Sequence, residues 1–488
     1  MFIGLDLGTT NVKALLADED GGVLARSSQA ISVRNLPGNG VEQDIEEIFA
    51  AAINALASLG AKAETSSVEA IGVSSQGGAL QLLDRQGNPL GPVISWLDGR
   101  AGSFNSAFTE KVGRDWLVRH IGCDRSAVAL GQLLRIEHEQ PGLLRRSRIA
   151  FVGDTIVGRL CGRAAHDATS LSLGMLYNPS QRRADGELLE RLGLSESQLP
   201  DLVSARQPAG ALLEDIARKT GLPAGIPVGP AVHDQYAAAM GVGATAAGAV
   251  MFGAGTAWVL LAVGDRLMAP AVPGAFNCTH VIDGLYGQIA SMGNGGSAIS
   301  WAARLMGLQS AGVGAVDDII RTVSPGSEGL IFWPLLAGYG GAGLADNTPG
   351  RLMGLRLHHG QAHVLRSVVE GLCLELGRYL LMLQDASVPV ERLLMCGGGA
   401  ASEITPRIIA DITGMELACT TEPDTSALGA AMLARGIAQA KRPLVEISAA
   451  MAPSFRTYRP GADSAVYQDS LERYVESMQP LAVEKGPA

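Results

Sequence analysis

The sequence predicts an α/β protein made of two halves of similar design, and three observations support this. Residues 2–7 and 12–17 are apolar runs joined by Gly8-Thr9-Thr10-Asn11, which is typical of a strand hairpin with a small-residue turn. Residues 249–262 repeat this order of strand, Gly-Thr turn and strand about half a chain later, with Gly255 aligned to Gly8. Helical and strand-like patterns then alternate behind both hairpins.

The first half continues with a strand, a helix and three more strands. A strand is expected at 23–33, after a turn at 20–22. A helix is expected from Asp44, which can cap it, to Gly60, which stops it. Its apolar positions recur at helical spacing, at Ile45, Ile48, Phe49, Ala52, Ile53 and Leu56. Further strands are expected at 69–74, 79–83 and 92–96.

The second half is expected to follow a similar plan. Its elements are a long helix at 363–384, a strand at 391–396, a helix from Pro406 and an Ala-rich helix at 426–440. We therefore expect a first domain at 1–240, a second at 241–440, and a tail at 441–488 that packs on the core.

The stretch 235–264 carries no charged residue and imitates a membrane span. It is rich in alanine and glycine, and Gly253, Gly255 and Thr256 interrupt it. A buried helix followed by buried strands is therefore expected here.

Charge argues against nucleic acid and anionic membranes as partners. The chain has 38 Lys and Arg against 48 Asp and Glu, a net charge of −10, and no basic block. Asp6 interrupts an N-terminal run that lacks basic residues, so no signal peptide is expected. Six scattered cysteines without CxxC spacing favour a reducing cytoplasm and no structural zinc.

Glycine is in excess: it makes up 62 of the 488 residues, roughly 13%, where about 7% is usual. Without a three-residue period this is not collagen. The excess predicts tight turns and backbone that approaches a ligand closely. Much of it clusters at 4–8, 72–78, 253–255, 293–296, 338–343 and 397–399.

The first hairpin is a candidate phosphate site. Gly8, Thr9 and Thr10 offer backbone N–H groups and hydroxyls, which are good phosphate donors. Asp6 points away from its apolar neighbours along the strand, so its carboxylate can face a cleft and hold a hydrated Mg²⁺. An ordinary hairpin with a strand-end aspartate is an equally good interpretation of this segment alone.

Two glycine-rich turns in the second half extend this hypothesis. Gly253-Ala254-Gly255-Thr256 repeats the first turn, and two facing hairpins would clamp a polyphosphate from both sides. Gly397-Gly398-Gly399 stand between a strand and a helix, where a base or ribose can lie on bare backbone. The alternative is a generous loop, although a loop needs one glycine rather than three.

Asp234 precedes a helix-like segment near the expected boundary between the halves. A carboxylate at a helix start is most often a cap. The functional alternative is a general base at a rigid, electropositive helix end, favoured by its place at a domain interface. His233 has no partner at metal-ligand spacing, so we expect it to be structural.

Two strand ends carry polar residues that suit a sugar. Asp98 and Arg100 can hydrogen-bond polyol hydroxyls, or they form a local ion pair in a surface turn. Gln76, Gly77 and Gly78 can line a sugar pocket, or they merely turn a corner.

Two other nucleotide motifs are excluded by their context. Residues 338–343 match GxGxxG but no helix start follows, so a dinucleotide site is not expected. No G-x-x-x-x-G-K-[ST] loop is present.

Taken together, these segments resemble the FGGY carbohydrate kinases of the actin/hexokinase-like ATPase superfamily. GLDLGTTNVKALL resembles their first phosphate motif and FGAGT their second. The segment around Asp234 resembles the one with the catalytic aspartate. The other matching segments, in chain order, are GVSSQGGALQLLD, WLDGRA, the stretch from Gly350 to Glu370, CGGGAAS and DTSALGAA.

The resemblance implies two ribonuclease H-like domains with an interdomain cleft, the sugar mainly on the first and ATP mainly on the second. Asp234 would be the base and Asp6 the ligand of the Mg²⁺ water. The implied ATP contacts are Gly8, Thr9, Thr10, Lys13, Gly253, Gly255, Thr256, Gly398 and Gly399; the implied sugar contacts are Gln76, Gly77, Gly78, Asp98, Arg100 and Asp234. The expected activity is ATP-dependent phosphorylation of a sugar or polyol hydroxyl, in a protein most similar to xylulokinase-type members. The oligomeric state stays open, with a homodimer as one alternative.

Two segments depart from the family pattern. Gln76-Gly77-Gly78 stands where xylulokinases usually have a Met-His pair, which removes an imidazole from the sugar pocket. The usual G-E-R-x-P loop is replaced by the sequence from Ala337 to Gly341. The acceptor therefore stays open between a ketopentose such as xylulose and a ribulose, erythritol or glycerol type. An actin-like ATPase without a sugar, a dinucleotide-dependent oxidoreductase and a silent sugar sensor are the alternatives from other classes.

Overall fold

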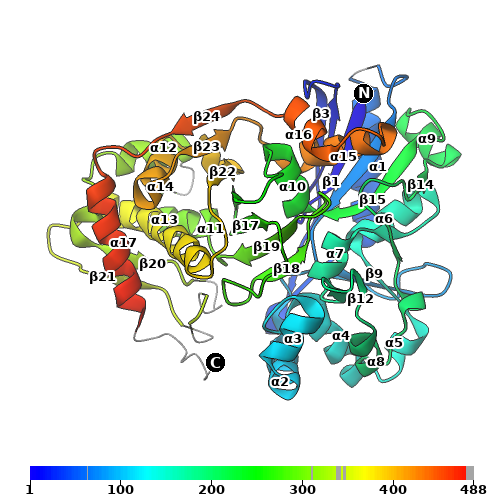
Figure 1. Ribbon diagram of the computed structural model, residues 1–488, viewed down its shortest axis with the longest axis horizontal. Helices are drawn as coiled ribbons and strands as arrows, with labels where there is room; N and C mark the ends of the chain where they lie inside the picture. Colours follow the sequence, from blue (N-terminus) through cyan, green and yellow to red (C-terminus); the bar gives the residue numbers. More distant parts are fainter. Residues whose placement is uncertain (63, 309–311, 337–341, 345–347, 480–488) are drawn as a thin grey trace.

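The computed structural model describes residues 1–62, 64–308, 312–336, 342–344 and 348–479. Two mixed sheets lie side by side, each at the centre of one α/β lobe (Figure 1). The first sheet runs in the order β13 (Asp201–Leu202), β10 (Ala165–His166), β15 (Pro227–His233), β6 (Ala70–Ser75), β1 (Phe2–Leu7), β2 (Asn11–Ala17) and β3 (Val23–Ala30), with β14 (Gly210–Ala211) beside β15. The second runs β18 (Phe276–Thr279), β19 (Tyr286–Ser291), β17 (Trp258–Gly264), β16 (Ala249–Ala254), β22 (Arg392–Cys396), β23 (Leu417–Thr420) and β24 (Phe455–Tyr458).

The two predicted hairpins occupy matching places in the two sheets. β1 pairs with β2 in antiparallel and with β6 in parallel, and β16 pairs in the same way with β17 and β22. Both faces of β1 are buried: its apolar residues are fully buried, whereas Asp6 is only half-buried. The predicted repeat of strand, Gly-Thr turn and strand is confirmed.

The predicted helices are also present. The expected helix at 44–60 is α1 (Ile45–Gly60), and the Asp44 carboxylate caps it by accepting from Glu46 N at 2.9 Å. The long helix of the second half is α13 (Gln361–Asp385), followed after β22 by α14 (Thr405–Thr413) and α15 (Thr425–Ala438). The uncharged stretch forms α10 (Asp234–Val242), β16 and β17, so the expected buried helix and strands are confirmed. Within the described residues no helix is long and apolar enough to cross a membrane.

The remaining elements surround these sheets. The first half has a smaller additional sheet, made of β4 (Arg34–Leu36), β5 (Gly40–Gln43), β8 (Val93–Ile94), β7 (Leu80–Leu83) and β9 (Arg148–Phe151). In the same half, β11 (Tyr177–Asn178) pairs with β12 (Arg183–Ala184). Its helices are α2 (Gly102–Val112), α3 (Arg114–Ile121), α4 (Val128–Glu139), α5 (Leu143–Arg146), α6 (Val152–Cys161), α7 (Ala168–Leu173), α8 (Gly186–Arg191) and α9 (Glu214–Thr220). The second half adds α11 (Gly296–Leu305), α12 (Val313–Ile320), β20 (Ile331–Trp333) and β21 (Arg351–Met353).

A close-packed layer of α10 and α15 joins the two lobes. Although α15 comes late in the sequence, it packs on β1 and β6 of the first sheet (orange beside blue in Figure 1). Glycines make this possible: a Cβ on Gly4 would lie 1.8 Å from Ala427 O, and one on Gly72 would lie 1.9 Å from Ala430 O. The expectation that these two glycines face a ligand is therefore wrong, because they face the backbone of a helix.

The tail begins on the layer of α10 and α15 and ends on the second lobe. Its elements are α16 (Leu444–Ala450), which packs on α15, then β24, then α17 (Ser464–Met478), which packs on α13 and α14. Two buried tyrosines of α17 donate to buried glutamates of α13: Tyr467 to Glu370 at 2.8 Å and Tyr474 to Glu375 at 2.9 Å. Of the glycine-rich segment at 338–343, residues 338–341 lie outside the described residues.

Candidate active site

Three parallel strands of the first sheet end together and carry the candidate residues. In the register of β1, β6 and β15, Asp6 pairs with Ser74, and Ser75 pairs with His233. The carboxyl ends of parallel strands are where α/β sheets usually bind ligands. The sheet therefore brings Asp6, the segment after Ser75 and Asp234 to one edge.

The two carboxylates at this edge are close enough to repel each other. Burial, and then the negative charge of Asp234, raise the pKa of Asp6 to about 7, although Ser74 Oγ donates to it at 2.8 Å. Burial also raises the pKa of Asp234 to about 6. Asp234 is the first residue of α10 rather than its cap, and 27% of its side chain is exposed. Its contacts are Gln235 Nε2 and His233 Nε2, both at 3.2 Å from Oδ1.

The first Gly-Thr turn is fixed by side chains. Thr9 Oγ1 donates to Gln76 Oε1 at 3.2 Å and accepts from Trp96 Nε1 at 3.0 Å. Gln43 Nε2 donates to the Thr9 carbonyl at 2.9 Å, and its Oε1 accepts from Gln76 at 3.1 Å. These contacts hold the predicted phosphate turn against the predicted sugar strand. Gln43 and Trp96 were not among the predicted site residues, although Trp96 opens the motif Trp-Leu-Asp that sequence patterns do identify.

Lys13, predicted as a phosphate contact, is paired with a carboxylate here. Its Nζ lies 2.8 Å from Asp424 Oδ1, directly before α15. Arg26 binds the same carboxylate at 3.4 Å and Glu422 at 3.1 Å. This ion-pair cluster links strands β2 and β3 to the start of α15. Only the folded chain brings these charges together: the motif DTSALGAA begins at Asp424, but it does not identify Lys13 as the partner.

The second Gly-Thr turn lies beside the triple glycine. A Cβ on Gly399 would be 2.7 Å from Ala254 Cβ, and one on Gly397 would be 3.0 Å from the Ala254 carbonyl carbon, so this loop packs on the hairpin. Gly398 faces open space, with nothing within 4 Å of a Cβ built there. Gly255 and Thr256 are exposed. The predicted adenosine loop and the second predicted phosphate turn are therefore neighbours.

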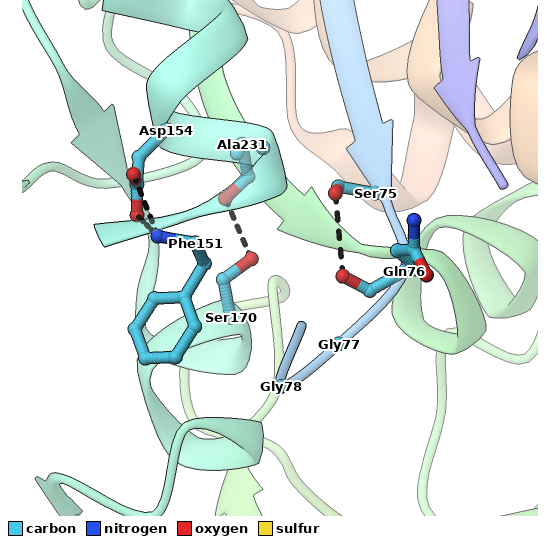
Figure 2. A pocket seen from close by; sticks show the side chains of 9 residues that line it. Ser75, Gln76, Gly77, Gly78, Phe151, Asp154, Ser170 and Ala231 are labelled. Atoms are coloured by element: carbon cyan, nitrogen blue, oxygen red, sulfur yellow. Dashed lines mark hydrogen bonds between the residues drawn. The ribbon is translucent and has the colours of Figure 1, made fainter. Parts of the chain in front are cut away.

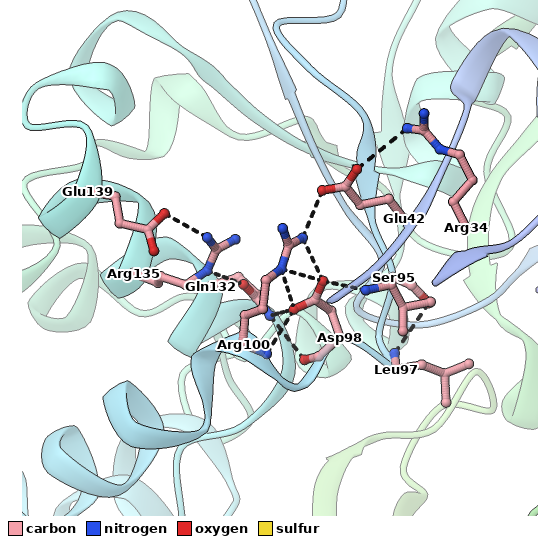
Figure 3. A network of polar contacts seen from close by, with 10 residues as sticks. Arg34, Glu42, Ser95, Leu97, Asp98, Arg100, Gln132, Arg135 and Glu139 are labelled. Carbon is pink, nitrogen blue, oxygen red and sulfur yellow. Dashed lines mark hydrogen bonds and ion pairs between the residues drawn. The ribbon is translucent and has the colours of Figure 1, made fainter. Parts of the chain in front are cut away.

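Asp98 is buried and accepts more hydrogen bonds than a residue in a surface ion pair would. Its side chain is fully buried and accepts hydrogen bonds from Val41 N at 2.8 Å and Arg100 Nε at 2.9 Å, as well as from Gln132 (Figure 3). Burial alone would raise the pKa of Asp98, but the hydrogen bonds from Arg100 and Val41 outweigh it and lower the pKa. Arg100 also binds Glu42 at 2.9 Å. Contacts of Asp98 and Arg100 with a sugar stay a prediction.

A small cavity lies behind the end of strand β6. It has a volume of about 10 Å³, room for about one water, and lies between Gln76, Gly77 and Gly78 on one side and Asp154 and Ser170 on the other (Figure 2). Neighbouring polar groups are satisfied locally, since Ser170 Oγ donates to the Ala231 carbonyl at 2.9 Å. This cavity is too small for a sugar.

A second group of potential metal ligands lies before α13. Side-chain atoms of Glu328, His358 and His359 lie within 4.8 Å of one another. However, His359 Nδ1 accepts a hydrogen bond from Arg356 N at 3.0 Å, which leaves the proton on Nε2. His358 Nε2 lies 3.2 Å from the Glu328 carboxylate. We interpret this group as a hydrogen-bonded cluster and assign no metal to it.

Two sequence-family profiles cover most of the chain. The N-terminal domain of the FGGY family of carbohydrate kinases matches residues 1–241, and the C-terminal domain of that family matches residues 244–435. The chain belongs to the FGGY family of carbohydrate kinases. Its two-domain α/β architecture is the actin/hexokinase-like fold of that family, as predicted, and it is a sugar phosphotransferase.

Individual FGGY kinases match over nearly the whole chain. The xylulose kinase of Escherichia coli (strain K12) is 28% identical over 484 residues, 99% of both chains. The gluconokinase of Bacillus subtilis (strain 168) is 25% identical and covers 88% of this chain, with 86% of its own length matched. The crystal structure of xylulose kinase from Rhodospirillum rubrum superposes with a TM-score of 0.88 at 24% identity, covering 98% of both chains.

Proposed function

We propose that this FGGY kinase phosphorylates a ketopentose of the xylulose type with ATP and Mg²⁺, and that Asp234 is its general base. The observation that carries the proposal is the place of Asp234. It stands at the rigid start of α10, partly exposed, at the strand edge that also holds Asp6 and the first Gly-Thr turn. The full-length match to a xylulose kinase supports the choice of acceptor.

Asp234 is suited to take a proton near neutral pH. Its pKa of about 6 keeps it mainly ionised at pH 7 and yet makes it a stronger base than an ordinary aspartate. The acceptor hydroxyl would lose its proton to Asp234 as its oxygen attacks the γ-phosphorus in line. The leaving group would be ADP. Positioning and neutralisation of phosphate charge supply most of the rate in such transfers.

The residues around Asp6 fit a divalent cation. When both are ionised, the carboxylates of Asp6 and Asp234 repel each other, and a bound cation would relieve this repulsion. Asp6 would hold the Mg²⁺ through water, and Mg²⁺ when bound would neutralise phosphate oxygens. Backbone N–H groups and hydroxyls of the two turns would hold the phosphates, with Lys13 beside them. Gly398 and Gly399 would border the adenosine.

A gluconate-type acceptor is the second candidate, because the B. subtilis gluconokinase also matches. Binding a carboxylated acceptor requires a cationic side chain that is not already paired with carboxylates of the protein. Among the predicted sugar contacts the cation is Arg100, and its guanidinium already binds Asp98 at 2.6 Å and Glu42 at 2.9 Å. This favours an uncharged acceptor.

Replacement of the base tests the proposal. We expect Asp234→Asn to lower kcat by roughly 10²–10⁴-fold while ATP still binds, because the amide keeps the shape but accepts no proton. Coupled ADP release measures turnover, and calorimetry measures ATP binding. The same assay on D-xylulose, D-ribulose, D-gluconate and glycerol identifies the acceptor class. Near-normal turnover of Asp234→Asn would refute the base, and preference for D-gluconate would refute the acceptor.

A further inference from the structure

The space beside Gly77 and Gly78 is occupied, although neither residue has a side chain. A Cβ on Gly77 would lie 2.3 Å from His233 Cδ2 and 2.5 Å from its Nε2. A Cβ on Gly78 would lie 2.1 Å from Val128 Cγ1. Contacts this short force a shift, so a side chain at either glycine would displace its neighbour. The two glycines therefore do not enlarge the pocket; they make room for residues from β15 and α4.

The imidazole that takes this space contacts the proposed base. His233 Nε2 lies 3.2 Å from Asp234 Oδ1. The backbone places the ring: β15 pairs with β6 so that His233 faces Ser75, and His233 N donates to Thr169 Oγ1 at 3.0 Å. With its proton on Nε2, the imidazole would be placed to donate to the ionised Asp234 across this 3.2 Å approach.

The imidazole ring of His233 forms few other polar contacts. His233 is 5% exposed, and its Nδ1 is buried without a hydrogen-bond partner among the described residues. Burial lowers the pKa of His233 to about 3, so the imidazole stays neutral at physiological pH. Tyr236 packs edge-on against it, with ring centroids 6.2 Å apart. The polar side-chain contact described for the ring is the one with Asp234.

Val128 is held in an unusual backbone conformation next to Gly78. It is the first residue of α4 and has φ +45°, in the left-handed region that a β-branched side chain rarely adopts. The preceding Ala127 N donates to Met175 Sδ at 3.0 Å, and Met175 also has a positive φ, of +59°. Val128 remains half-buried. Strained residues of this kind persist where the surrounding structure fixes them, often beside a ligand site.

We propose that His233 is a positioning residue for Asp234, and that His233 and Val128 together set the shape of the sugar pocket over Gly77 and Gly78. The inference rests on the proposed role of Asp234 as base. Residues far from the sugar strand in sequence would thus decide which ketose or polyol hydroxyl reaches the carboxylate. The neutral imidazole would orient that carboxylate by donating from Nε2.

Two substitutions at His233 separate positioning from packing. His233→Ala removes the donor, whereas His233→Gln keeps a side-chain N–H within reach of Asp234. We expect His233→Ala to lower kcat for D-xylulose by roughly 10–100-fold, the usual cost of losing a group that orients a functional ligand, with KM for ATP unchanged. His233→Gln should keep kcat within about threefold of wild type.

The pH profile provides a readout that packing does not move. A hydrogen bond to a carboxylate favours its charged form, so its loss raises the carboxylate pKa. The acid limb of kcat should therefore shift to higher pH in His233→Ala and stay near its wild-type place in His233→Gln. Equal losses in both variants with an unshifted limb would overturn the positioning role.

A double-substitution cycle tests whether Gly77 makes room for His233. Gly77→Ala should lower kcat in the wild-type background because the methyl group displaces the ring. It should have little further effect in His233→Ala, where that space is empty. Gly91→Ala is the matched control, because nothing lies within 4 Å of a Cβ at Gly91. Thermal unfolding checks that each variant is folded. Independent, additive losses would overturn the proposed contact.

Val128→Ala tests the shape of the pocket. We expect the ratio of kcat/KM for D-fructose to that for D-xylulose to rise at least tenfold, as expected for removing bulk from a pocket wall. An unchanged ratio would overturn this part of the proposal. Asp234→Asn, measured in parallel, distinguishes failure of the proposed function from failure of this inference. If Asp234→Asn is active, Asp234 is not the base. If Asp234→Asn is inactive while the His233 and Val128 variants behave as wild type, only this inference is refuted.

Discussion

The two Gly-Thr hairpins share one backbone plan and differ in chemistry. Both β1–β2 and β16–β17 pair in antiparallel and add a parallel neighbour on the other side. In the alignment of Gly8 with Gly255, the carboxylate of Asp6 corresponds to the bare backbone of Gly253. The first hairpin thus carries a charge that suits a cation, and the second leaves space that suits a phosphate or nucleoside.

The two turns are also held by different means. Thr9 is fixed by side chains, namely Gln76 and Trp96. The second turn is fixed by backbone: Gly296 N donates to the Gly255 carbonyl at 2.9 Å, and Ser297 N donates to the Thr256 carbonyl at 3.1 Å. The comparison shows that a repeated hairpin conserves geometry while its side chains specialise. The first turn is joined to the predicted sugar strand and the second to the predicted adenosine loop.

The largest expected difference between the hairpins is at Asp6 and Gly253. We expect Asp6→Asn to lower kcat by roughly 10–100-fold at limiting Mg²⁺, because the neutral amide no longer attracts the cation. Gly253→Ala should change kcat less than about threefold, since its Cβ would meet Gln235 Oε1 at a comfortable 3.4 Å. Coupled ADP release over a Mg²⁺ series measures both. Equal sensitivity at the two positions would contradict the chemical asymmetry.

A smaller difference is expected at the two threonines. Thr9→Val removes hydrogen bonds to both Gln76 and Trp96, so kcat/KM should fall about tenfold for the sugar as well as for ATP. Thr256→Val should raise KM for ATP about threefold and leave KM for the sugar unchanged. Steady-state kinetics with each substrate varied in turn separates these outcomes. A sugar effect in Thr256→Val would mean that the second turn is not confined to the nucleotide side.

The smallest effect concerns stability without nucleotide or metal. The pKa of Asp6 is raised in the folded chain, so its favourable contribution is complete below the unfolded pKa near 4 and is lost as pH rises through about 7. Asp6→Asn should therefore raise Tm by about 2 °C at pH 8 relative to wild type, with the gain vanishing towards pH 4. Thermal scans in chelator test this. A gain of equal size at both pH values would assign the effect to packing instead of charge.

Local patterns predicted the elements and most of the motif positions. Hydrophobic periodicity suffices for α1, which buries one face, and apolar runs suffice for α13 and for β1 and β16 of the hairpins, which are buried on nearly all sides. The expectation drawn from the glycine excess, a close approach to a ligand, was wrong at Gly4 and Gly72, where glycine allows a helix to pack closely. A missing side chain marks a close approach, but the sequence alone does not reveal whether a ligand or a helix makes it.

The contacts within the site needed the sheet order. The sequence alone predicts a structural His233, because no regular ligand spacing surrounds it. Its contact with Gly77 arises because β15 lies beside β6, and that with Asp234 because α10 begins where β15 ends. The pairing of Lys13 with Asp424 likewise depends on α15 docking on the first sheet.

The sequence by itself determined that this chain has two related α/β halves with glycine-rich turns, a carboxylate near a strand end at Asp6 and another at a helix start at Asp234. Those features follow from periodicity and turn chemistry, which act between residues close in the chain. Only the tertiary structure decided that Asp6 and Asp234 share one edge, and that His233 and Val128 fill the space over Gly77 and Gly78. Such contacts join residues far apart in sequence, so they are set by strand order and packing, which no local pattern encodes.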